Sequence, residues 1–156
     1  MTSVAKRTDS AYRIIVASPA RLYAAFIDPM ALAAWLPPKG MTGRIEAFDP
    51  RPGGAYRMAL AYDDKGSGRG KSEADTDRIE GEFVGLEPDM RIVQRAAFES
   101  DDPSLEGVMT ITWRFDPVPQ GTRVTVTCAD VPVGIRKKDH LAGLRSTLAN
   151  LAAFAE

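Results

Sequence analysis

The feature that most constrains this chain is a change in the spacing of its apolar residues. Between residues 41 and 131 they alternate with polar residues in short runs separated by turn residues, whereas from 136 to 155 they recur at helical spacing. We therefore expect an antiparallel meander of strands at 43–49, 55–62, 77–86, 90–99, 107–116 and 122–129. The long helix that follows should carry on one stripe Leu141, Leu144, Leu148 and Leu151.

The start of the chain predicts a strand and two short helices. Residues 10–17 are rich in β-formers, and Ser18 and Pro19 then supply an N-cap and a first helical residue. Pro29 interrupts this helix, and a second short one ends before Pro37. These elements indicate an α+β fold, in which a curved antiparallel β-sheet wraps around a long C-terminal α-helix and two short helices follow the first strand.

Length and composition favour a single domain over residues 1–156. With 44% hydrophobic residues the chain can bury a real core. We expect residues 1–9 to be flexible, and residues 63–76 to form a mobile loop because they are rich in Gly, Ser and charge. Within that loop GSGRGKS, at 66–72, resembles a phosphate-binding loop only superficially, because its glycines enclose three residues where the motif needs four.

Charge and targeting features exclude several classes of partner. The 20 basic and 21 acidic residues nearly cancel, so no bulk field draws the chain to nucleic acid or to an anionic membrane. No apolar run approaches the roughly 18 residues of a membrane-spanning helix, and we expect no membrane insertion. The single cysteine and the lack of a signal-peptide pattern favour the cytoplasm. We expect the protein to be a monomer or a homodimer.

The sequence holds few residues for metal or cofactor chemistry. One histidine, His140, and one cysteine, Cys128, give no recognisable zinc or haem pattern, so we expect no cofactor and no metal. The carboxylates of Glu99, Asp101 and Asp102 are the remaining candidate ligands, but they are more typical of a solvated loop. Cys128 belongs to an apolar alternation, which predicts a buried and unreactive thiol.

His140 is the one candidate for catalysis by histidine, and it lies near the start of the terminal helix. A general base also needs an orienting partner and a substrate within reach, and the sequence identifies neither. A lone histidine is more often structural or solvated, so we assign no catalytic residue.

The strongest functional signal is apolar. Large side chains fall on the faces of helices and strands that should meet between sheet and terminal helix, and Gln94 shares a strand face with Ile92 and Phe98. Such residues can fill a core or line a cavity, and periodicity does not distinguish the two. The candidate ligand-binding residues are Trp35, Tyr56, Met58, Leu60, Phe83, Gln94, Phe98, Met109, Trp113, His140, Leu144 and Leu148.

Several spaced motifs over about residues 11–155 resemble a known family. They are SPARLYAAFIDPMALAAWLPP, GRIEAFDPRPGGAYRM, EGEFVGLEPDMRIV, TITWRFDPVPQGTRVTVT and HLAGLRSTLANLAAF. They are similar to the SRPBCC, or START-like, superfamily and, within it, to the polyketide-cyclase-related proteins homologous to the activator of heat-shock protein 90 ATPase. One departure lies in the last helix, where many members carry Gly-Trp and this chain has Gly143-Leu144.

The resemblance implies a helix-grip fold, START-like and Bet v-like, with a deep cavity between the curved sheet and the last helix. It implies binding of a small apolar or amphipathic ligand, with no enzymatic activity assumed. The first alternative is a cyclase- or hydrolase-like enzyme, in which His140, Tyr56 and an acidic residue would converge on one point of that cavity. The second is a co-chaperone that activates a partner ATPase, although the eukaryotic activators carry an additional amino-terminal domain for which we expect no room here.

Overall fold

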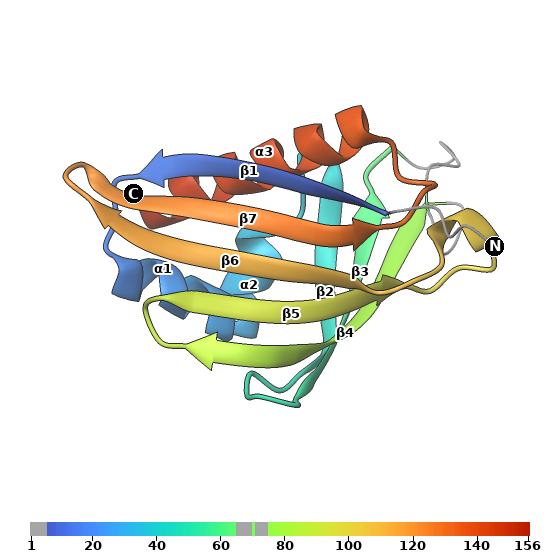
Figure 1. The fold of residues 1–156 in the computed structure, drawn as a ribbon, viewed down its shortest axis with the longest axis horizontal. Helices are drawn as coiled ribbons and strands as arrows, with labels where there is room; N and C mark the ends of the chain where they lie inside the picture. The colour runs from blue at the N-terminus through green and yellow to red at the C-terminus, as the bar shows by residue number, and fades with distance from the viewer. Residues whose placement is uncertain (1–5, 65–69, 71–74) are drawn as a thin grey trace.

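One antiparallel sheet and three helices make up the fold (Figure 1). The computed structural model describes residues 6–64, 70 and 75–156. In chain order the strands are β1 (Arg7–Ile15), β2 (Met41–Phe48), β3 (Ala55–Tyr62), β4 (Thr76–Glu87), β5 (Arg91–Phe98), β6 (Met109–Val118) and β7 (Gly121–Val131). The helices are α1 (Pro19–Ile27), α2 (Pro29–Trp35) and α3 (Lys137–Ala155), with a short 3-10 helix, η1, at Pro103–Leu105.

The order of the strands shows how the chain crosses the sheet and covers one of its faces with helices. The sheet runs β1-β7-β6-β5-β4-β3-β2, so the first two strands of the chain form its two opposite edges. The helices α1 and α2 carry the chain from one edge to the other, and the remaining strands return as a meander. The sheet curves, and α3 lies along the same face as α1 and α2 (Figure 1). The predicted α+β helix-grip architecture is therefore confirmed.

Local signals in the sequence begin the helices where they were expected. The Ser18 hydroxyl accepts a hydrogen bond from the Arg21 backbone N–H at 3.2 Å, with Pro19 in the first turn of α1. Asp28 in the same way accepts from the Met30 backbone N–H at 3.0 Å and begins α2. These two caps turn the chain sharply at the end of β1 and again between the helices.

The N-terminal strand begins earlier than the sequence indicates. We expected residues 1–9 to be flexible, but Arg7–Asp9 form the start of β1, and residues 1–5 lie outside the described residues. Arg7 and Asp9 are both charged, so this part of the strand has no apolar alternation. The side chain buried there is the Asp9 carboxylate, which pairs with Arg7. Most of the predicted 63–76 loop also lies outside the described residues, including nearly all of the GSGRGKS segment.

The packing of α3 differs along its length. Leu148 and Leu151, in its C-terminal half, are fully buried, and the end of this half accepts a hydrogen bond from Arg21 of α1 at the Ala155 carbonyl oxygen. Leu141 and Leu144, in its N-terminal half, are only partly buried. The apolar stripe of α3 is therefore packed into the core at one end and leaves space above the sheet at the other.

Candidate functional site

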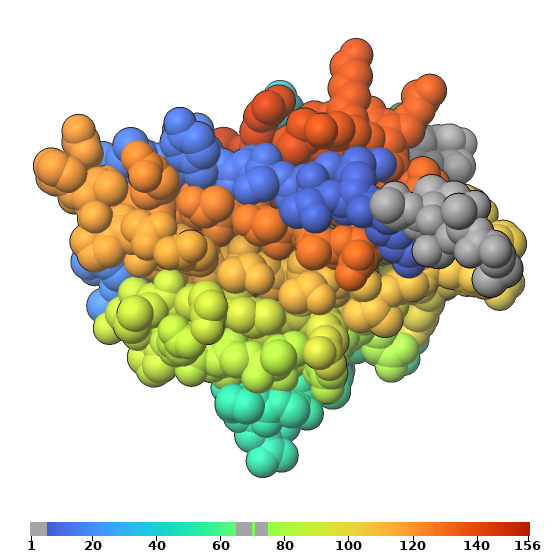
Figure 2. Space-filling model, viewed as in Figure 1, coloured from blue at the N-terminus to red at the C-terminus, as the bar shows by residue number. Residues whose placement is uncertain are grey.

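A pocket of about 880 Å³ lies between the N-terminal half of α3 and the inner face of the sheet. Its walls come mainly from β3, β4, β5, β6, the loop before α3 and α3 itself, with α1 and α2 at one end. The opposite, outer face of the sheet is a continuous surface of strands with no hollow (Figure 2). The curvature of the sheet and the partial packing of α3 together produce this space.

Most of the candidate residues line this pocket. On β3 the alternating Tyr56, Met58 and Leu60 point into it, as the period of two along a strand requires. The other candidates among its lining residues are Gln94, Phe98, Met109, Trp113, His140 and Leu144.

Trp35, Phe83 and Leu148 do not line the pocket, and all three are buried in the surrounding core. Trp35 donates its indole N–H to the Ala25 carbonyl oxygen at 2.9 Å and packs edge-on against Phe26, with ring centroids 4.7 Å apart. Leu148 lies in the packed half of α3. Periodicity places these side chains on the inner face correctly but does not give their depth.

Several lining residues were absent from the candidates. Phe26 stands where Trp35 was expected, with its ring 4.8 Å from that of Trp113. Phe26 lies four residues after the buried Leu22, which is the spacing of residues on one helix face, so its inward orientation could be predicted. Ile111 alternates with Met109 and Trp113 along β6, so strand alternation places it on the same face.

Gln94 is a polar group in the largely apolar wall. Its side-chain oxygen accepts a hydrogen bond from the Trp113 indole N–H at 3.3 Å, and the residue is only 9% exposed. This bond fixes the orientation of the amide. The amide nitrogen has no hydrogen-bond partner within the described part of the chain. Gln94 therefore offers a donor to the pocket.

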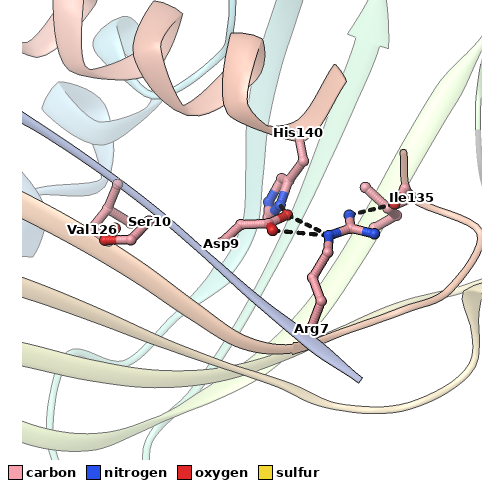
Figure 3. A network of polar contacts seen from close by, with 6 residues as sticks. All are labelled: Arg7, Asp9, Ser10, Val126, Ile135 and His140. Atoms are coloured by element: carbon pink, nitrogen blue, oxygen red, sulfur yellow. Dashed lines mark hydrogen bonds and ion pairs between the residues drawn. The ribbon is translucent and has the colours of Figure 1, made fainter. Parts of the chain in front are cut away.

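A charged network lies at the start of α3 (Figure 3). His140, in the first turn, places its Nδ1 2.7 Å from Oδ2 of Asp9 on β1, whose carboxylate is fully buried. Arg7 Nε donates to the same carboxylate at 2.8 Å, and the Arg7 guanidinium also donates to the Ile135 carbonyl oxygen. Burial alone would raise the Asp9 pKa, but the hydrogen bonds from His140 and Arg7 outweigh it and hold the pKa below its usual value. No sequence pattern identified Asp9, which supplies an orienting partner for His140.

Tyr56 does not join this network by its hydroxyl. The phenol donates to the Arg95 backbone oxygen at 3.3 Å, and burial raises its pKa well above the ordinary range. It reaches across β4 because Gly81 has no side chain: a Cβ there would come within 2.6 Å of the Tyr56 hydroxyl. An acidic residue, Asp9, is therefore in contact with His140, but Tyr56, the third residue of the enzyme alternative, is hydrogen-bonded to the sheet backbone.

The remaining chemical candidates have structural surroundings. Cys128 lies opposite Asp9 on β7, and burial, with the nearby Asp9 charge, raises the pKa of its thiol to about 12. The predicted buried thiol is therefore confirmed. Glu99 pairs with Arg57 at 2.8 Å, and Asp102 begins η1 by accepting from the Ser104 backbone N–H at 2.9 Å. Within residues 6–64, 70 and 75–156, no cluster of three or more histidine, cysteine or acidic residues is arranged to hold a metal.

The sheet, the gripped helix and the pocket between them define a helix-grip protein of the START-like class. Residues 16–156 match the family model described as activator of Hsp90 ATPase homolog 1-like protein. The chain belongs to this family, as its motifs indicated.

Solved structures agree with this assignment. Protein CV1439 from Chromobacterium violaceum is 32% identical, with 96% of each chain covered and a TM-score of 0.85. A Rhodobacter sphaeroides protein is 21% identical over 94% of this chain and 89% of its own, with a TM-score of 0.74. DynU16, from the dynemicin biosynthetic locus, is 20% identical with a TM-score of 0.68 over 94% of this chain and 46% of its own. At these lower identities the likeness shows the fold alone.

No curated protein matches the chain significantly. In the part of the chain that the structure describes, no helix has the length and apolar character needed to cross a membrane.

Proposed function

We propose that this protein binds a small apolar or amphipathic molecule in the pocket between its sheet and α3. The observation that carries the proposal is the space itself: about 880 Å³ falls within the roughly 300–1,000 Å³ typical of small-molecule sites. A core that packed to ordinary density would leave no such volume.

The chemistry of the wall supports an apolar ligand with few polar groups. Tyr56, Met58, Met109 and Trp113 supply aromatic and flexible apolar surface, and methionine adapts readily to different ligand shapes. The buried polar residues of the wall are Gln94, Asp77 and Thr147, and its other charged residues lie at exposed positions, so affinity should come chiefly from buried apolar area and less from ionic attraction.

Leu144 gives a direct test of the pocket, because it lines the wall at the position where many family members carry Trp. We expect an environment-sensitive hydrophobic dye to bind the wild-type protein, and to bind Leu144→Trp more weakly because the indole occupies part of the space. Fluorescence titration at low and high salt measures both affinities, and salt should change them little.

The matched control is Met90→Trp, which adds the same ring at an exposed position outside the pocket. It should bind the dye as the wild type does. Native mass spectrometry of gently purified protein complements the titration by weighing any retained ligand. The proposal fails if the wild type binds no apolar probe, or if both Trp variants weaken binding equally.

A further inference from the structure

We propose that the Asp9–His140 pair gives the pocket a fixed hydrogen-bond acceptor, Nε2 of His140, that selects ligands carrying a phenolic or enolic hydroxyl group. The inference rests on the proposed function, because it assigns a chemical class of ligand to the same pocket. It is carried by the contacts of Asp9, Arg7 and His140 (Figure 3) and by the presence of His140 among the residues that line the pocket.

The first step is the tautomer of His140. An ionised carboxylate has only acceptor sites, so the imidazole nitrogen 2.7 Å from Asp9 Oδ2 must be the one that carries hydrogen. That nitrogen is Nδ1. A neutral imidazole with its proton on Nδ1 has a lone pair on Nε2, and Nε2 then accepts hydrogen bonds.

The second step is the charge balance around Asp9. Arg7 Nε lies 2.8 Å and 2.9 Å from the two carboxylate oxygens, and the guanidinium is anchored in turn on the Ile135 carbonyl. This cation compensates the buried negative charge. The carboxylate therefore has a cationic partner in addition to the imidazole.

The third step is the position of the free nitrogen. The His140 side chain is only 16% exposed and lines the pocket, and within the described residues Nε2 has no hydrogen-bond partner. An acceptor that lines the pocket without a protein partner is free to accept a hydrogen bond from a ligand. The Gln94 amide nitrogen, on β5, adds a donor for an acceptor elsewhere on the same ligand.

The fourth step chooses among possible ligand donors. A carboxylate or phosphate ester offers acceptors and would meet the Nε2 lone pair without a bond. An ammonium group carries a charge that must be desolvated and three donors, of which Nε2 satisfies only one. A hydroxyl group has one donor, which a single acceptor satisfies. Phenols and enols combine that donor with an apolar body that suits this wall.

Imidazole nitrogen NMR tests the tautomer in the unmodified protein. Because His140 is the only histidine in the sequence, a histidine-labelled sample gives an unambiguous pair of ¹⁵N signals. In the pH range where these signals report a neutral imidazole, the spectrum should show a protonated Nδ1 and an unprotonated Nε2. Addition of 2-naphthol should shift the Nε2 signal, whereas 2-methoxynaphthalene, which has no donor, should leave it nearly unchanged. A predominant Nε2–H form would overturn the proposal.

A binding comparison tests the selectivity. The ratio of the affinities for 2-naphthol and 2-methoxynaphthalene should fall about tenfold from wild type to His140→Phe, the scale of one buried hydrogen bond. Comparing ratios cancels the difference in hydration between the probes. The control Lys138→Phe places the same ring on an exposed neighbour outside the pocket and should keep the wild-type ratio.

The outcomes separate the two proposals. If wild type binds both probes and His140→Phe keeps the same ratio, the role of His140 is wrong and the pocket stands. If wild type binds neither probe, the pocket function and the hydroxyl selectivity fall together. Should His140→Phe fold poorly, the NMR experiment still decides, because it uses only the wild-type protein.

Discussion

Removal of each of the two tryptophans in turn should distinguish the core of this protein from its pocket. Both rings are at least 95% buried and lie edge to face, with centroids 6.1 Å apart, but only Trp113 lines the pocket. Replacing a buried Trp by Ala costs roughly 3 to 5 kcal/mol. Trp35 is surrounded on all sides, so Trp35→Ala should cost about 5 kcal/mol, because it creates a closed cavity.

Trp113→Ala should cost less, about 3 kcal/mol. Part of this ring borders the pocket, so fewer packing contacts are lost than at Trp35, although the Phe26 contact and the bond to Gln94 disappear. With a urea m-value of about 2 kcal/mol/M, that loss lowers the unfolding midpoint by about 1.5 M. Because the deletion enlarges an existing pocket, Trp113→Ala should also accept bulkier apolar probes than the wild type does.

Urea titration followed by circular dichroism measures both variants, and dye titration measures the pocket. A loss below about 1 kcal/mol for Trp113→Ala would place that ring at the surface. Equal losses for the two variants, with no change in the size of probe accepted, would mean that Trp113 is enclosed like Trp35, and the pocket would then not reach it.

Two more substitutions test particular contacts. Gly81→Ala should destabilise the protein by about 2 kcal/mol or more, because its Cβ collides with Tyr56 and a carbonyl of β5; thermal unfolding measures this, and an unchanged Tm would contradict the packing described. Since the Asp9 pKa is lowered by folding, its contribution to stability is present above the unfolded value of about 4 and is lost as pH falls through the lower folded value. The stability gap between wild type and Asp9→Asn should therefore shrink on acidification in this range, and a gap that widened would show that the carboxylate is not held ionised by Arg7 and His140.

The sequence was a good guide wherever one interaction repeats along an element. Strand alternation placed Tyr56, Met58 and Leu60 together, and helical spacing placed the leucines of α3 on one stripe, because each period follows directly from backbone geometry. It was a poor guide to depth. Phe83 and Leu148 satisfy the same periods as lining residues, but sheet curvature and the tilt of α3, which depend on the whole fold, decide that they lie in the core.

Asp9 shows a different reason for a missed residue. It lies in a polar stretch, and its burial depends on Arg7 beside it and on His140 far along the chain. No local pattern records a partner at that separation. The register shift between Arg7 and Asp9 in the β1–β7 pairing adds a bulge that alternation does not anticipate.

The pairing of β1 with β7 has a consequence for how this protein is made. In the described residues β1 pairs with β7, which lies far along the sequence. During synthesis β1 therefore remains unpaired until residues 121–131 have emerged from the ribosome. Pairing of β1 with β7 is slow, because the chain loses the entropy of closing a long loop before the contacts form. The hairpins between β2 and β7 should therefore fold first. A nascent chain of this protein therefore exposes the β1 edge, with Tyr12, Ile14 and Val16 on it or beside it, until β7 has been made, and chaperone binding at that stage should fall on β1.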